Sequence, residues 1–242
     1  LNRNALEIAL VGDIDEQKAI DAVAKTLGAL PKRAETFDNY DEARNHSWSS
    51  KRGTFEFGHA AKDDQLAWSR RWLTTDDRDY KTEQQMVLLS RVVSLRLVEE
   101  LREKLGATYS PSASSNMSDV YRERGVFAIS ISGNPKDIPT IEASVDAIMA
   151  ELLAAPISAD MFERARKPVL ESYADWRKSN STWIGIASIA QSKPDRLDRF
   201  RINEAQFRAI TRDDLWNAAK RFLGKAADFT FRAIPASSLP AT

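Results

Sequence analysis

The sequence predicts an α+β fold in which helices pack on one face of an antiparallel or mixed β-sheet. Three observations lead to this prediction: paired strand-like segments with short connections, one long amphipathic helical segment between the pairs, and several helices before a closing strand. Strands that are joined by short turns favour antiparallel pairing, and grouped helices favour packing on one side of the sheet.

The composition fits a large globular domain and argues against several classes of function. The 242 residues are 43% hydrophobic and carry a formal net charge of zero, so charge gives no reason to expect nucleic acid or an anionic membrane surface as a partner. No apolar run reaches the roughly 18–20 residues of a membrane-spanning segment. The chain has no cysteine, which excludes disulfides, thiolate catalysis and cysteine zinc sites.

The only two histidines are His46 and His59. A catalytic zinc ion usually has two or three protein ligands, mostly histidines, and the sequence contains no H-x-x-E-H or H-x-x-x-H pattern. His46 lies in a polar segment and His59 in a strand-like one, with no nucleophile elbow nearby. We interpret both as surface or edge-strand residues, so we expect neither a metal site nor a catalytic residue within this chain.

Residues 1–31 read as one strand followed by one helix. The apolar run "LEIALVGDID" at 6–15 predicts a buried strand that ends in a turn. Asp15 is placed to cap a helix over 16–30, and Gly28 and Pro31 end it. A single strand and helix cannot bury their own apolar faces, so we expect this segment to pack on something else.

Residues 32–52 form the predicted linker. They have no hydrophobic period and are rich in charged residues, serine and asparagine. Connections longer than about 12–15 residues are usually functional or join separate units. We therefore expect the main domain to begin at residue 53.

The segments from 53 onward predict the sheet and its covering helices. Alternation predicts a strand over 53–60, and tryptophans in a strand-like context predict another over 64–75. Apolar residues at spacings of three and four predict a long helix over 79–104, ended by Gly106.

The remaining elements follow from the same signals. We expect an extended segment over 107–117 and a clean strand over 125–133. Helices are expected over 134–155, 158–179 (with a kink or local adjustment at Pro168), 182–192, 203–210 and 211–224, and a closing strand over 228–235. The helix over 211–224 opens with Thr211 as its N-cap and Asp214 at the third helical position, which resembles a capping box. The helix and strand that end the chain echo the strand and helix that begin it, which suggests that residues 1–31 are the tail of a preceding copy of the same domain.

The stretch "SLRLVEELREKLGATYSPSASSNMSDVYRERGVFAISISG" resembles the C-terminal, non-catalytic half of the M16 zinc metallopeptidases, the family of insulinase, pitrilysin and the mitochondrial processing peptidase. "ALVGDIDEQKAIDAVAKTLGALPKR" is similar to the strand and helix that end one domain of that family before its linker, and "PISADMFERARKPVLESY" also fits the pattern. The element R-E-K-L-G-x-x-Y is the most specific part of the resemblance.

The resemblance implies a protein of two halves that close around a chamber and have different roles. The zinc site would lie in a metal-bearing N-terminal half that is absent from this chain, so the chain alone would bind no zinc and cleave nothing. Its partners would be that half and a peptide substrate, which family members commonly hold as an added β-strand. Bacterial relatives with this layout are often exported, which favours the periplasm.

Arg102 and Tyr109 are the substrate-binding residues that the resemblance implies. An arginine has a permanently charged fork of donors that can hold a peptide carbonyl or terminal carboxylate. A tyrosine hydroxyl can donate to the oxyanion that develops during peptide hydrolysis. The plain alternative is that Arg102 is a solvated cation at a helix end and that Tyr109 packs on the sheet.

The sequence departs from the family where glycines often precede the second half of the long helix, because residues 90–94 read "SRVVS". Two alternative functions remain open at this point. The chain could belong to a catalytically inactive M16-like scaffold or binding subunit. It could also be an unrelated α+β domain that binds a peptide or another ligand.

Overall fold

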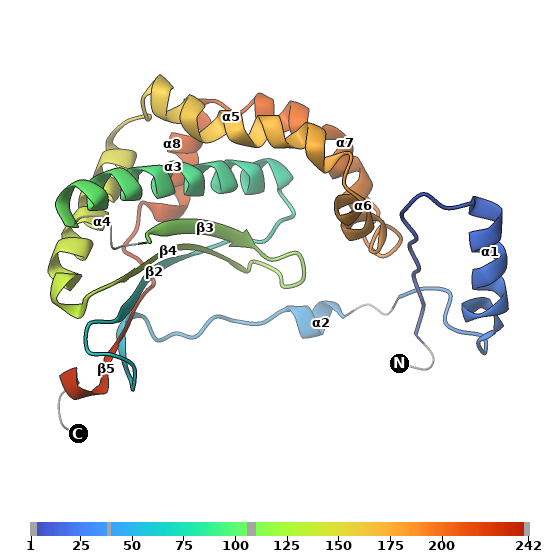
Figure 1. The fold of residues 1–242 in the computed structure, drawn as a ribbon, viewed down its shortest axis with the longest axis horizontal. Helices are drawn as coiled ribbons and strands as arrows, with labels where there is room; N and C mark the ends of the chain where they lie inside the picture. Colours follow the sequence, from blue (N-terminus) through green and yellow to red (C-terminus); the bar gives the residue numbers. More distant parts are fainter. Residues whose placement is uncertain (1–3, 38–39, 106–109, 240–242) are drawn as a thin grey trace. The chain divides into compact units, whose positions relative to one another are not determined.

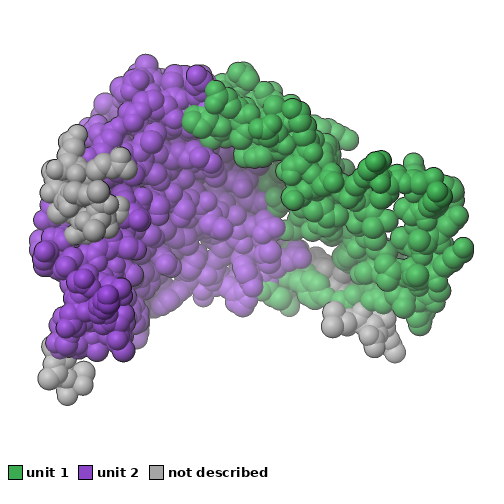
Figure 2. Space-filling model, viewed as in Figure 1, with its two compact units in different colours: residues 1–43, 168–208 green, residues 44–167, 209–242 purple. Residues whose placement is uncertain are grey.

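The computed structural model describes residues 4–37, 40–105 and 110–239, with only the backbone described for 102–105. The described chain forms two compact units (Figure 2). The larger unit comprises residues 44–167 and 209–242, and the smaller comprises 1–43 and 168–208. The domain boundaries predicted at residues 31 and 52 stay a prediction, because a division by compactness does not test where one domain of the family ends and the next begins.

A five-stranded mixed sheet forms the centre of the larger unit, with the strand order β1-β5-β2-β4-β3. The strands are β1 (Gly53–His59), β2 (Leu66–Thr74), β3 (Ser112–Met117), β4 (Gly125–Gly133) and β5 (Phe229–Pro235). β2 pairs antiparallel with β4 and β5, β3 pairs antiparallel with β4, and β1 pairs parallel with β5. The predicted α+β class with a mixed sheet is confirmed.

Helices cover one face of this sheet, as predicted (Figure 1). They are α3 (Tyr80–Leu105), α4 (Ile138–Ala154), which follows the 3-10 turn η2 (Pro135–Asp137), and α8 (Arg212–Leu223). The core lies between the helices and the sheet, and its fully buried side chains come from both layers: Trp68, Met86, Leu89, Leu97, Leu101, Phe127, Ile129, Ile141 and Ile148. Alternation along the strands leaves every second side chain on the opposite, helix-free face.

The sequence signals for helix termini are confirmed at α8. The Thr211 side chain accepts a hydrogen bond from the Asp214 N–H at 3.1 Å, and the Asp214 carboxylate accepts one from the Thr211 N–H at 2.9 Å. This is the predicted capping box. Burial alone would raise the pKa of Asp214, but the hydrogen bonds from Thr211 outweigh it and hold that pKa below its ordinary value.

The helix α5 (Ala159–Trp176) begins in the larger unit and continues into the smaller one, passing through Pro168. The smaller unit also contains α1 (Glu16–Lys25), a 3-10 turn η1 (Leu27–Ala29), α6 (Asn180–Ala187) and α7 (Asp195–Arg208), and the short helix α2 (Asp41–Arg44) ends at its boundary. The side chain of Asp15 accepts from the Lys18 N–H at 3.0 Å, which confirms the predicted cap of α1.

The strand predicted at residues 6–15 is wrong, because no described residue of 4–15 forms a strand. A strand needs a neighbour to take its backbone hydrogen bonds, and no described strand pairs with this segment. The segment instead contacts the connection between α6 and α7: the Glu7 carboxylate accepts hydrogen bonds from the Gln191 N–H and from the Ser192 hydroxyl, the latter at 2.9 Å.

Candidate peptide-binding surface

The two residues predicted to bind substrate lie where the structure gives no side-chain description. The Arg102 backbone belongs to α3, but its side chain lies outside the described part, and Tyr109 lies outside it entirely. The structure therefore neither brings the two side chains together nor separates them. It does describe the second half of α3, whose backbone includes Arg102, and the edge strand β3, which begins at Ser112.

The second half of α3 is firmly anchored in the larger unit. Leu97 and Leu101 are fully buried, and on the outer side Glu99 accepts hydrogen bonds from Arg164 at 2.7 Å and from Arg96 at 3.1 Å. The Arg164 guanidinium, followed by that of Arg96, holds the pKa of Glu99 below its ordinary value. Glu99 is therefore held by two arginines and is not simply a solvated side chain.

A serine of α3 is bonded to the backbone of β3. Ser94 Oγ accepts from the Ala113 N–H at 2.8 Å and lies 3.2 Å from the Ala113 carbonyl oxygen and 2.9 Å from that of Ser90. Ser94 belongs to the "SRVVS" stretch, so the departure from the family's glycines has a structural counterpart here.

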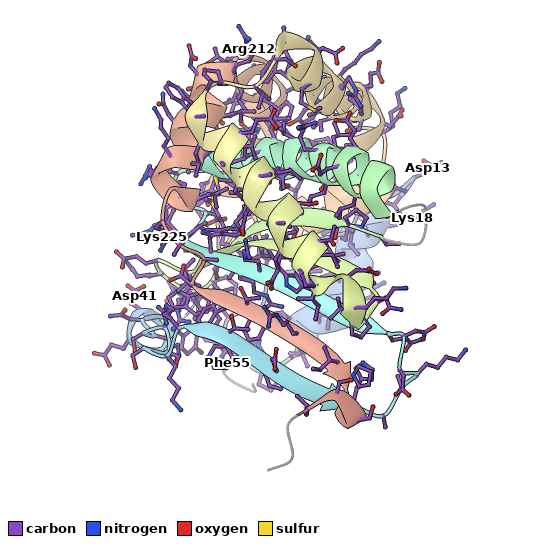
Figure 3. The ribbon with its side chains drawn as sticks, turned by 90° about the vertical axis from the view of Figure 1, so that its left-hand side faces the viewer. Asp13, Lys18, Asp41, Phe55, Arg212 and Lys225 are labelled. Carbon is purple, nitrogen blue, oxygen red and sulfur yellow. The ribbon has the colours of Figure 1, made fainter. Side chains whose placement is uncertain are left out.

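The helix-free face of the sheet exposes a row of phenylalanines, which we call the phenylalanine ladder: Phe55 and Phe57 of β1, and Phe229 and Phe231 of β5. Ring centroids lie 5.7 Å apart for Phe55–Phe231 and for Phe229–Phe231, and 6.2 Å apart for Phe57–Phe231. Phe57 is 54% exposed although it is apolar. Figure 3 labels Phe55 on β1, the outermost strand of the sheet.

Two arginines lie over the ladder. The Arg71 guanidinium is 4.9 Å from the Phe231 ring centroid, and that of Arg52 is 5.0 Å from the Phe229 centroid. Arg52 is held there by Asp228, whose carboxylate is 3.0 Å from its Nε and also accepts the Leu73 N–H at 2.8 Å. Burial alone would raise the pKa of Asp228, but these hydrogen bonds hold it below its ordinary value.

Most of the rest of the helix-free face is made of small side chains, and the larger exceptions are Leu73 of β2 and Val126 of β4. Ser112, Ser130 and Ser69 stand in register across β3, β4 and β2. Their neighbours on this face are also small: Ala67 of β2, Ser114 and Asn116 of β3, and Ala128 and Ser132 of β4. The helix-free face therefore carries small polar side chains at β3 and aromatic side chains at β1.

A cleft of about 510 Å³ lies on the other side of the sheet, beside the start of β1. It is lined by Gly53 and Thr54, by Trp72, and by residues of α4 and of the segment after α8. Arg70 within it forms an ion pair with Asp146, so its charge is already matched. The cleft shows where the helix layer stops short of the edge strand.

Both histidines are used in local structure. The His46 carbonyl accepts from Arg124 Nε at 3.0 Å, and the His59 ring lies 3.0 Å from the Gln65 carbonyl oxygen and 3.2 Å from the Ala61 N–H. Within the described residues, no three histidine, aspartate or glutamate side chains are grouped so that they could hold a metal ion. No described helix is long and apolar enough to cross a membrane.

The sequence matches a family model described as "Peptidase M16 inactive domain" over residues 1–169. A curated relative is the chloroplastic stromal processing peptidase of Pisum sativum, which is 27% identical over 107 residues. That match covers 44% of this chain and 8% of the relative. The chain thus spans a small part of the curated relatives that it matches.

Two solved structures have a similar fold. One is the periplasmic protease PqqL from Escherichia coli, with a TM-score of 0.69 and 15% identity, over 93% of this chain and 24% of that one. The other is a peptidase M16 inactive domain from Pseudomonas fluorescens, with a TM-score of 0.67 and 20% identity, over 95% of this chain and 54% of that one. These likenesses establish the fold.

Proposed function

We propose that this chain, which belongs to the M16 peptidase family as one of its inactive domains, closes the substrate chamber of a zinc-dependent endopeptidase and helps to hold the peptide. The zinc would lie in a separate metal-bearing half, so the chain alone would cleave nothing. In this proposal residues 1–31 are the end of the preceding domain, residues 32–52 link the two, and residues 53–242 are the chamber-closing domain. A periplasmic location remains an expectation.

The exposed apolar surfaces of both compact units support a missing partner. On the larger unit, the phenylalanine ladder includes Phe57, which is 54% exposed. On the smaller unit, α1 has no buried residue and Ile20 is 52% exposed. Apolar patches of this kind usually mark surfaces that another protein part covers. In this proposal, the metal-bearing half of the peptidase covers these surfaces.

Arg102 and Tyr109 are the residues that we propose to contact the peptide. The Arg102 guanidinium would donate to a backbone carbonyl or terminal carboxylate of the substrate. The Tyr109 hydroxyl would donate to the oxyanion that develops on the scissile carbonyl, a contact that strengthens in the transition state. The anchored second half of α3 supports this role, because a positioned donor needs a rigid support.

A kinetic test in the complete peptidase separates this role from that of an inactive scaffold. We expect Arg102→Ala to lower kcat/KM by more than about tenfold, which corresponds to about 1.4 kcal/mol. Arg91→Ala is the matched control, because Arg91 is an exposed arginine on the same helix. Equal kcat/KM values for wild type, Arg102→Ala and Tyr109→Phe would favour the scaffold.

A further inference from the structure

We propose that the outer edge of β1 binds an extended peptide as an added strand, with apolar side chains beside the phenylalanine ladder and a basic side chain facing Glu56. This inference gives the peptide a place and a side-chain chemistry that the chamber-closing role does not specify. It rests on the proposed function only for the source of the peptide.

The outer edge of β1 presents backbone groups that have no partner in the described structure. The Gly53 N–H donates to the Asp228 carbonyl at 3.1 Å, so odd-numbered residues of β1 point their backbone groups at β5. Successive residues alternate, so Thr54, Glu56 and Gly58 point theirs away from the sheet. Within the described residues, β1 pairs only with β5. An uncovered edge of this kind is a template for another strand.

The opposite edge of the sheet is less available. The Ser118 N–H donates to the Arg124 carbonyl at 2.7 Å, so even-numbered residues at the end of β3 face β4 and Ala113 faces outward. Ser94 of α3 already bonds the Ala113 N–H. A peptide that approached β3 would have to displace this contact, whereas β1 makes its main contacts with β5 and with the short turn η3 (Ala236–Ser238).

Side-chain chemistry on the two faces of β1 defines the pattern of the added strand. On the helix-free face, Phe55 and Phe57 would flank the peptide, and an apolar or aromatic side chain there would extend the ladder by a cross-strand pair. On the other face, η3 closes the space beside Gly58, because an added Cβ would lie 2.8 Å from Leu239. The positions left open on that face lie beside Thr54 and Glu56, and Glu56 is the one that carries a charge.

The charge beside Glu56 favours a basic residue. Arg232 lies 2.9 Å from Glu56 Oε1 and 2.7 Å from Glu142 Oε1, so one guanidinium serves two carboxylates. Burial alone would lower the pKa of Arg232, but the hydrogen bonds that its guanidinium donates to these two carboxylates outweigh burial and raise that pKa, which keeps the guanidinium charged. The cluster has a net charge of −1 (two carboxylates minus one guanidinium), and a lysine or arginine opposite Glu56 would neutralise it.

The same charge argues against a second copy of this chain as the occupant. An antiparallel pair of β1 strands centred on Glu56 would place one Glu56 directly opposite the other. Like charges at directly opposed positions destabilise a strand pair. A separate peptide with alternating apolar and basic residues is free of this conflict.

Binding to the full 242-residue chain tests the proposal, and no metal-bearing half is needed. The probe is a fluorescent, capped pentapeptide with phenylalanine at positions two and four and lysine at position three, followed by anisotropy. Two analogues carry N-methyl groups on alternate amides. Because only one set of amides faces β1, we expect one analogue to bind at least about tenfold more weakly and the other to bind like the parent.

Substitutions at residue 56 test the edge itself. Glu56→Pro removes an outward N–H, which an edge strand tolerates, and we expect it to abolish binding. Glu56→Lys keeps the backbone and should reverse the preference, so that a peptide with glutamate at position three binds more tightly than the lysine peptide. This second variant keeps the test valid if the proline variant fails to fold.

Three results would overturn the proposal: equal effects of the two N-methyl patterns, unchanged binding by both variants, or self-association of the chain that Glu56→Pro removes. The last result would assign the edge to a second copy. Peptide binding here and an inactive complete enzyme together would retain the β1 site and reject the peptidase role. The two claims can therefore fail separately.

Discussion

Replacing Ser94 by alanine tests whether the contact between α3 and β3 stabilises the β3 edge of the sheet. The Ala113 N–H would lose its acceptor at 2.8 Å, and a partly buried amide without a partner costs about 1–3 kcal/mol. Alanine is the better helix former, which returns up to about 0.5 kcal/mol. We therefore expect a local destabilisation of about 1–2 kcal/mol.

Amide hydrogen exchange at Ala113 is the most direct assay for this change. A loss of about 1.4 kcal/mol corresponds to about a tenfold faster exchange. Ser90→Ala is the matched control, because the Ser90 hydroxyl donates to the Val87 carbonyl of the same helix, at 2.8 Å, and not to β3. Ser94→Ala and Ser90→Ala with equal exchange rates at Ala113 would refute the reasoning.

Three further substitutions have defined outcomes. Asp76→Asn removes a buried carboxylate: burial alone would raise the pKa of Asp76, but hydrogen bonds from Arg78 and from the Glu123 N–H outweigh burial and lower that pKa. In urea titrations, the difference in unfolding free energy between wild type and Asp76→Asn should be constant above about pH 5 and should decrease below about pH 4. Thr211→Ala should cost about 1 kcal/mol by loss of the cap, whereas Thr54→Ala should be neutral. Phe231→Ala should lower the free energy of unfolding by about 1–2 kcal/mol. An unchanged urea midpoint would show that the phenylalanine ladder does not stabilise the sheet.

Local patterns were sufficient to predict most of the larger unit. The alternation in β4 and the long apolar stripe of α3 are properties of consecutive residues, and both elements were predicted within a few positions. The early start of α7 at Asp195 was missed because its first turns are mostly charged. Arginine and aspartate at that spacing carry no hydrophobic period.

The surface features could not be predicted because they depend on pairing between distant segments. The phenylalanine ladder joins β1 to β5 across more than 170 residues, as does the Glu56–Arg232 ion pair. Ser94 looked like an ordinary polar residue in an amphipathic helix, and nothing in its neighbours indicated a bond to Ala113. The strand expected at 6–15 failed for the same physical reason, because local pattern cannot provide a partner strand.

Cleavage of a peptide by this chain mixed with its metal-bearing half, with and without a zinc chelator, tests the central claim most directly. The account predicts activity that requires both parts and that the chelator abolishes. A stable complex of the two parts that cleaves nothing, with or without chelator, would contradict it and would assign the chain to a scaffold role.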